Sequence, residues 1–344
     1  MRVYVRLALL LGVVGVLLLS GGETVAAPGG TRRVSLSSGG GEGDGVSEYP
    51  AISADGRYAT FHSASKLVTA DTNVLRDVFV RDRQTAATER ASVTSNGVQS
   101  TSGDSVHPAI SADGRHVAFD TFATDLVPGD TQLCPFGYNC PDVLAHDRVT
   151  GATVLISLSS GGVQGDGDNM FPDISGNGRY VAFQSPATNL VAGDTNVFCQ
   201  NDPDPELDNC GDVFVRDRDT DEDGIFDEAE AGAVSTTRVS VSTSDYRPEG
   251  NGYSGDAAIS GDGNQVAFWS VASNLVADDH NGVDDVFVYD SVVGPVGGIA
   301  ELPDVAGSSA PNYVPLAGLA AGALALLSAG AWFARRRTRL GRRP

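Results

Sequence analysis

One block of sequence recurs four times along this chain, and that recurrence limits the possible folds more than any other feature. The copies of the block are PAISADGRYATF from Pro50, PAISADGRHVAF from Pro108, PDISGNGRYVAF from Pro172 and AAISGDGNQVAF from Ala257. A second, shorter block follows each copy: DVFV from Asp77, DVLA from Asp142, DVFV from Asp212 and DVFV from Asp285. Recurrence at intervals of tens of residues indicates a repeat architecture in which each copy is one structural unit.

Each copy of the repeat predicts four short antiparallel strands. An apolar stretch ends in Asp-Gly or Asn-Gly, and these dipeptides supply the positive φ angles that a tight hairpin turn requires. A stretch of alternating side chains follows the turn, and the aspartate-led block is a third strand, rich in β-branched and aromatic residues. A fourth stretch closes the first three units at residues 90–92, 155–157 and 238–240. Four short strands per repeat are typical of a propeller blade.

The fourth copy lacks its closing strand, because nothing like the sequence TTRVS follows Asp290. A matching piece, TRRVS, occupies residues 31–35 at the other end of the chain. We therefore expect an all-β fold, a β-propeller of four blades at about residues 31–92, 93–157, 158–240 and 241–292. We expect the N-terminal strand to lie beside Asp285 and Val288 and so to close the ring, which removes the free sheet edge.

The repeats resemble the WD40-like units of TolB-type β-propellers. The resemblance rests on the pattern I-S-x-D-G-R-x-x-A-F and on the valine-rich strand after it, and it covers residues 31–290. It implies a non-catalytic module that binds a protein or a glycan at the cell surface. Two alternatives stay open: an extracellular hydrolase of glycans or peptides that uses carboxylates at the propeller mouth, and a purely structural surface protein.

Both ends of the chain carry apolar runs that predict an exported, membrane-anchored protein. Residues 1–27 are typical of a signal peptide, with Arg2 and Arg6 before the apolar run; a retained anchor is the alternative. Residues 313–333 hold no charge and are long enough to cross a bilayer as a C-terminal transmembrane helix. The arginine-rich tail, 334–344, then lies in the cytoplasm by the positive-inside rule, which places the propeller (28–300) and a linker (301–312) outside.

A short motif before the apolar run leaves one processing question open. Leu302-Pro303-Asp304 has the position of a sortase signal, but Val305 and Ala306 stand where that signal has threonine and glycine. A plain C-terminal anchor is the favoured interpretation.

The charge of the expected exterior part excludes one class of partner. The whole chain carries 23 basic and 44 acidic residues, and eight of the basic ones lie in the two terminal segments. Without those segments the net charge falls from −21 to about −28. Phosphate backbones and anionic lipids repel such a surface, so we expect no nucleic-acid partner. The same negative charge favours the binding of cations.

The four cysteines form two local pairs. Both pairs enclose insertions at the same place in the repeat, just before the aspartate-led strand of the second and third copies: Cys134 with Cys140, and Cys199 with Cys210. In an exported chain this arrangement favours two disulfides, 134–140 and 199–210. A zinc site is the alternative, although the spacing is not C-x-x-C.

An insertion in the third repeat predicts a calcium site. Residues 219–230 read DTDEDGIFDEAE and fit D-x-D-x-D-G-x-x-x-x-x-E. The pattern assigns the Ca²⁺ ligands to five carboxylates and one carbonyl: Asp219, Asp221, Asp223, Ile225 (through its carbonyl), Asp227 and Glu230. The loop resembles those of EF-hands, dockerins and thrombospondin type 3 repeats, although a strand rather than a helix precedes it. A solvated acidic loop is the alternative.

The remaining polar patterns predict no catalytic group. Asp-x-Asn or Asp-x-Gln precedes the third strand of every repeat, as at Asp71 and Asn73, and turn chemistry explains it better than a metal does. The five histidines are scattered along the sequence, and no nucleophile elbow, P-loop or dinucleotide fingerprint is present.

Overall fold

The computed structural model of the protein describes residues 29–130, 139–195, 210–244 and 248–291. These residues contain strands and no helix, and the strands form four antiparallel sheets in chain order. The first sheet is made of β1 (Ser47–Ile52), β2 (Tyr58–Ser63), β3 (Asp77–Asp82) and β4 (Ala87–Arg90). The second is made of β5 (Ser105–Ile110), β6 (His116–Thr121), β7 (Asp142–Asp147) and β8 (Thr153–Leu155).

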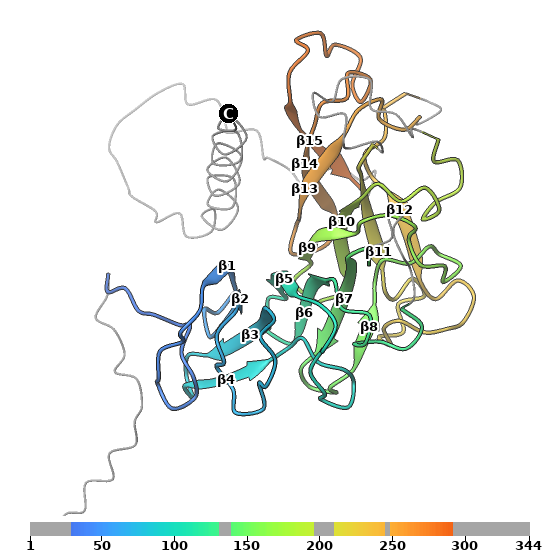
Figure 1. Ribbon diagram of the computed structural model, residues 1–344. Coiled ribbons are helices and arrows are strands. Elements are labelled where there is room, and N and C mark those ends of the chain that lie inside the picture. The colour runs from blue at the N-terminus through green and yellow to red at the C-terminus, as the bar shows by residue number, and fades with distance from the viewer. Residues whose placement is uncertain (1–28, 131–138, 196–209, 245–247, 292–344) are drawn as a thin grey trace, which may run out of the picture.

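The third and fourth sheets repeat this order. The third is made of β9 (Met170–Ile174), β10 (Tyr180–Ser185), β11 (Asp212–Asp217) and β12 (Ser235–Arg238). The fourth has three strands, β13 (Ser254–Ile259), β14 (Gln265–Ser270) and β15 (Asp285–Asp290). The four sheets follow one another along an arc, with β1, β5, β9 and β13 on its concave side (Figure 1). The predicted all-β class with one antiparallel sheet per repeat is confirmed.

The turn between the first two strands of each sheet forms as its sequence predicts. In the first sheet Gly56 has a φ of 70°, which a side chain would disfavour. Ser53 donates its hydroxyl to Asp55 at 2.7 Å, and the same carboxylate accepts the amide of Arg57 at 2.9 Å. The Ser-x-Asp-Gly-Arg sequence therefore closes the hairpin through its own side chains.

The core lies between adjacent sheets rather than inside one of them. Val78 and Val80 project from β3 onto the second sheet, where they join Ile110, and both valines are fully buried. Equivalent clusters lie between the second and third sheets and between the third and fourth. Each sheet is therefore stabilised mainly by its neighbours, as in a propeller.

The expected ring closure by residues 31–35 is wrong for this structure. Those residues form no strand beside β15, and Val34 packs instead against Phe61 and Phe79 of the first sheet. The reason is that the arc stays open: the N-terminal segment lies at the first sheet, where Arg81 donates to the carbonyl of Ser37 at 2.9 Å. This contact holds the N-terminal segment at the first sheet, while β15 lies at the far end of the arc (Figure 1).

The predicted segments at the two ends of the chain fall outside the described residues. Residues 1–28 and 292–344 include the predicted signal peptide, linker, transmembrane helix and tail. Within the described part of the chain, no helix has the length and apolar character needed to span a membrane.

Candidate functional site

The first strand of every sheet contains a β-bulge with a left-handed residue. The four residues have φ angles of 47° to 53°, and none is glycine: Tyr49, His107, Phe171 and Asp256. In each bulge, this residue and the next stand opposite one phenylalanine of the second strand. Three of the four precede proline, which further disfavours a helical backbone. Such strain persists only where the surroundings impose it, and it is concentrated at functional sites.

The strained residues gather on the concave side of the arc. The ring of His107 lies 4.4 Å from that of Tyr49 and 4.3 Å from that of Phe171, measured between ring centres. Tyr49 also stacks on His62 of β2, with the ring centres 5.2 Å apart. The first three sheets therefore contribute to one continuous patch of aromatic and imidazole rings.

A side chain of the preceding sheet accepts the amide hydrogen of each strained residue from the second sheet onward. His62 Nδ1 accepts from the amide of His107 at 3.3 Å, and Asp120 Oδ1 accepts from that of Phe171 at 3.2 Å. Gln184 Oε1 accepts from the amide of Asp256 at 2.9 Å. The three acceptors occupy one position of the repeat, directly after the phenylalanine of the second strand. They fix the strained backbone of three of the four bulges, those at His107, Phe171 and Asp256.

The best-defined polar contact of this patch joins His107 and Asp120. His107 Nδ1 lies 2.9 Å and 3.1 Å from the two carboxylate oxygens of Asp120, whose side chain is completely buried. Burial raises the pKa of Asp120, and the nearby charge of His107 opposes that rise. This contact holds the imidazole through Nδ1 and so fixes the orientation of the ring. We call Tyr49, His62, His107, Asp120 and Phe171 the inner cluster.

The fourth sheet extends the inner cluster with further aromatic and acidic groups. Tyr253 and Trp269 stack with their ring centres 5.4 Å apart, and Trp269 donates its indole hydrogen to Asp256 at 3.0 Å. Tyr253 also binds Gln184 Nε2 through its hydroxyl at 2.8 Å. Aromatic faces and carboxylates therefore line the same concave surface.

The inner cluster is not apparent from the order of residues along the chain. The histidines are scattered in the sequence, and His62 and His107 lie 45 residues apart. Alignment of the four repeats against one another carries the signal, since it places four different residue types at one position: His62, Asp120, Gln184 and Trp269. Variation at one position, where neighbouring positions repeat closely, indicates side chains that do more than maintain the fold.

The predicted calcium loop brings together three of its aspartates. Carboxylate oxygens of Asp219, Asp221 and Asp223 lie within 4.8 Å of one another and could hold a metal ion. Asp219 accepts the amides of Asp223 and Gly224, both at 3.1 Å, so the chain wraps around its carboxylate. Gly224 has a φ of 86°, as the sharp turn in the pattern requires. Oxygen ligands of this kind suit a hard cation.

The other predicted ligands are placed differently. Asp227 accepts a hydrogen bond from Nη2 of Arg218 at 2.6 Å. Arg218 also packs over the ring of Phe226, so the Asp227 carboxylate is held on one side of the loop. Glu230 lies outside the group of three aspartates, and Ile225 is exposed. The structure therefore assembles the first half of the predicted ligand set without the second half.

The predicted cysteine pairs are only half described. Cys140 and Cys210 are both buried, whereas Cys134 and Cys199 lie outside the described residues. Both pairings, and the zinc alternative, stay predictions.

The Asp-x-Asn turns form as turn chemistry predicts. Asn73 Oδ1 accepts the amide of Leu75 at 3.1 Å, and Asn281 Oδ1 accepts that of Val283 at 3.0 Å. These bonds satisfy the backbone of the turn without a metal.

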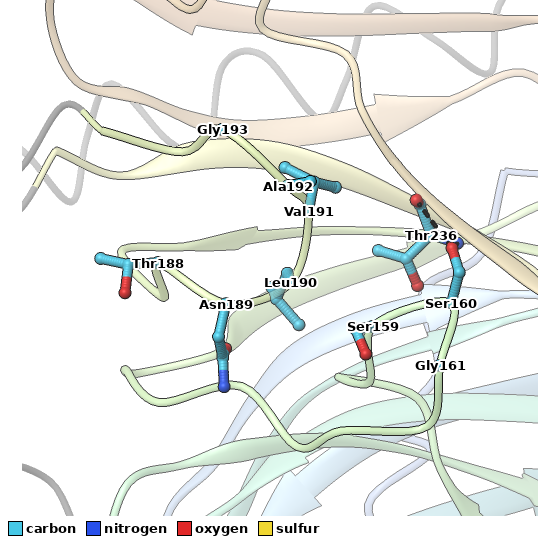
Figure 2. A pocket seen from close by; sticks show the side chains of 10 residues that line it. All are labelled: Ser159, Ser160, Gly161, Thr188, Asn189, Leu190, Val191, Ala192, Gly193 and Thr236. Atoms are coloured by element: carbon cyan, nitrogen blue, oxygen red, sulfur yellow. Dashed lines mark hydrogen bonds between the residues drawn. The ribbon is translucent and has the colours of Figure 1, made fainter.

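A surface pocket of about 650 Å³ lies away from the inner cluster. Figure 2 shows it between the turn at Ser159 and Ser160, the loop from Thr188 to Gly193, and Thr236 of β12. Ser160 and Thr236 bind each other across its wall, with the amide of Thr236 donating to Ser160 Oγ at 2.9 Å. The lining holds hydroxyl, amide and aliphatic groups and no titratable side chain, so the pocket offers no acid–base chemistry.

No protein-family model and no curated protein matches this chain. Solved structures similar to it include TolB from Acinetobacter baumannii, at 14% identity over 73% of this chain and a TM-score of 0.38. Another is an oligogalacturonate lyase in complex with manganese, at 13% identity over 73% of this chain and a TM-score of 0.38. The chain spans 42% and 51% of the length of these two proteins. Its own sheets define its class: an all-β protein built from propeller-type blades.

Proposed function

We propose that this protein is a non-catalytic binding module that takes a protein segment or a glycan on the concave side of its arc. The observation that carries the proposal is the row of four strained residues, which presents two aromatic rings, an imidazole and a carboxylate side by side. Aromatic faces bind sugar rings and apolar side chains, while a few placed polar groups fix the orientation of the ligand. The strain is retained because ordered surroundings hold each residue in place for that contact.

The cell-surface setting is part of the same proposal. The signal-like N-terminus, the C-terminal apolar run and the arginine-rich tail support an exported protein on a membrane anchor. The two cysteine pairs suit an oxidising exterior, where they would staple the two inserted loops.

Ligand binding is tested with glycan arrays and with pull-down of surface proteins by the full chain. We expect Tyr49→Ala with Phe171→Ala to weaken binding at least tenfold, because both rings of the contact surface are lost. Phe122→Ala is the matched control, since Phe122 is an exposed aromatic residue outside the inner cluster. Equal binding by the double variant and the control would contradict the proposal.

The hydrolase alternative has one observation in its favour. The buried carboxylate of Asp120 holds His107, and the carboxylate of Asp256 lies on the same concave surface. This arrangement provides an oriented imidazole and a second acidic group, as general acid–base catalysis requires. Release of products from bound glycans or peptides, abolished by His107→Gln, would favour the hydrolase over the binding module.

We further propose that the aspartate loop binds Ca²⁺ and is stabilised by it. Asp219, Asp221 and Asp223 supply oxygens within reach of one ion, and Glu230 would complete the set after a rearrangement of its half of the loop. Binding to the folded state alone raises the free energy of unfolding by RT ln(1 + [Ca²⁺]/Kd). At a typical extracellular Kd of roughly 0.1–1 mM, several millimolar Ca²⁺ stabilises the protein by about 1 kcal/mol or more.

Calorimetric titration of the chelator-treated full chain with Ca²⁺ tests this site. We expect Asp221→Asn to weaken binding without disturbing the loop, because Asp221 is exposed and Asp219 makes the bonds that shape the turn. Glu230→Ala reports separately whether the predicted twelfth position contributes a ligand. Asp278→Ala, an exposed acidic residue elsewhere, is the control. Binding heats that do not differ between the wild type and Asp221→Asn would exclude the site.

A further inference from the structure

The three junctions between sheets share one arrangement. At each junction, two alternate residues of one sheet's third strand pack against an isoleucine that ends the first strand of the next sheet. These three residues belong to one core cluster at each junction. The three sets are Val78 and Val80 with Ile110, Val143 and Ala145 with Ile174, and Val213 and Val215 with Ile259. The repeat therefore encodes a complementary pair of faces on every sheet.

The two end sheets each expose one face of this pair. Val286 and Val288 of β15 correspond to Val78 and Val80 of β3, yet they are 63% and 61% exposed, whereas the β3 pair is fully buried. Ile52 of β1, at the position of the buried isoleucines, is 56% exposed. Among the described residues nothing covers either face, although the chain contains both halves of a fourth junction.

The polar side chains of a fourth junction are likewise split between the two ends of the chain. At the end of the first sheet, Ser92 donates to Asp77 at 2.7 Å and Arg90 donates to Asp77 at 3.1 Å. Arg90 also reaches Gln99 at 2.8 Å, and Arg238 makes the corresponding bonds to Asp212 and Glu249 in the third sheet. The N-terminal segment carries the same group of side chains: Arg33, Ser35 and Glu42.

Only half of that arrangement is present at the N-terminus. Arg33 is paired with Glu42, as Arg238 is with Glu249. The missing acidic partner corresponds to Asp285, which lies at the other end of the arc and accepts a hydrogen bond from Asn281. Charge and apolar surface on one end therefore match those on the other.

We propose that two copies of this chain join end to end, each completing the other's fourth junction. Residues 33–35 of one copy become the fourth strand of the last sheet of its partner, and Val286 and Val288 pack against Ile52. The segment lies at the first sheet, where Thr88 donates its amide to Ser38 at 2.9 Å, whereas β15 of the same chain lies at the other end of the arc (Figure 1). Two arcs related by a two-fold axis form a closed ring of eight sheets, within the range of known propellers.

The mass of the full chain in mild detergent, measured by analytical ultracentrifugation, tests the association. We expect a dimer for the wild type and a folded monomer for Val288→Asp, because the valine is solvent-exposed before association and a buried aspartate has no partner at the junction. Val74→Asp is the control, since Val74 is 87% exposed and lies outside both faces; it should remain dimeric. A monomeric wild type, or an assembly larger than a dimer, would overturn the two-fold ring.

Disulfide trapping identifies which chain supplies the strand. A Ser35→Cys chain mixed with a differently tagged Asp285→Cys chain should give a cross-linked heterodimer on a non-reducing gel, because the equivalent pair, Ser92 and Asp77, is in hydrogen-bond contact. Each single variant alone is the control for linkage through the native cysteines. A third chain carries both Ser35→Cys and Asp285→Cys. A cross-link within this double variant, with no heterodimer from the mixture of single variants, would show that the ring closes within one chain and would overturn the proposal.

Discussion

Leu155 occupies the position at which the first and third sheets carry Arg90 and Arg238. The aspartate beside it, Asp142, therefore receives hydrogen bonds from Ser157, Gln164 and Asn169, and among the described residues from no guanidinium. Burial raises the pKa of Asp142 to about 7, and its bonds to those neutral groups only partly oppose the rise. A single residue of the repeat thus decides whether this buried carboxylate is matched by a charge.

Leu155→Arg should stabilise the protein at high pH relative to the wild type. The folded state of the wild type binds a proton at Asp142 up to pH 7, whereas the unfolded state loses it near pH 4, so this group's stabilisation is lost as pH rises through 7. A guanidinium would lower the folded pKa and cancel the loss, by about 1.4 kcal/mol for each unit.

Urea unfolding at pH 5 and pH 8 measures this effect as a difference between the variant and the wild type. Val149→Arg is the control, since Val149 is 74% exposed and places the same charge in solvent. An advantage of Leu155→Arg that is no larger at pH 8 than at pH 5 would contradict the explanation.

The element on which every sheet depends is the hairpin turn between its first two strands. The turn glycine of the second sheet, Gly114, has a φ of 74°, and a Cβ there would lie 2.2 Å from the ring of Tyr58 in the first sheet. A Cβ at the turn glycines of the third and fourth sheets, Gly178 and Gly263, would likewise overlap the rings of His116 and Tyr180. The turn therefore also sets the distance between neighbouring sheets.

Gly114→Ala should cost more stability than the same change in an open turn. Gly97 has nearly the same φ, 75°, but nothing lies within 4 Å of a Cβ built there. Gly97→Ala should cost about 1 kcal/mol through backbone strain alone. Gly114→Ala adds a steric overlap with the ring of Tyr58 and should cost about 2 kcal/mol more, because that ring packs against Arg57 and Arg148 and cannot move freely. Thermal unfolding of the two variants measures the difference, and equal losses would show that the contact with Tyr58 does not matter.

At the scale of the whole molecule, the arc makes stability uneven along the chain. The second and third sheets have a neighbour on both faces, and β6 and β10 are buried almost throughout. The last sheet has a neighbour on one face, and residues along β15 alternate between half-buried and exposed. Local opening is easiest where few apolar contacts cover the backbone.

Hydrogen exchange of the Val288→Asp variant should therefore be faster in β15 than in β6 and β10. This variant is used because Val288 is exposed, so its replacement leaves the fold intact while it prevents association through the last sheet. Mass spectrometry of peptides from each strand measures the exchange rates. Equal protection of β15 and β6 in the variant would show that the four sheets unfold as one unit.

The local pattern of the sequence determined much of this fold. The alternating stretches and the Asp-Gly dipeptides predicted the strands and turns, because a strand's two faces and a turn's φ angles depend on residues close together in the chain. The aspartates at 219, 221 and 223 were likewise predicted, since they lie in one short loop.

Only the tertiary structure decided the shape of the array and the composition of the inner cluster. His62 of the first sheet meets His107 and Asp120 of the second because the two sheets pack side by side with their bulges at equivalent places. The predicted closure failed for a related reason: the rotation from one sheet to the next arises from packing across each junction. A small difference in that packing, repeated three times, separates a ring from an open arc, and no local pattern encodes it.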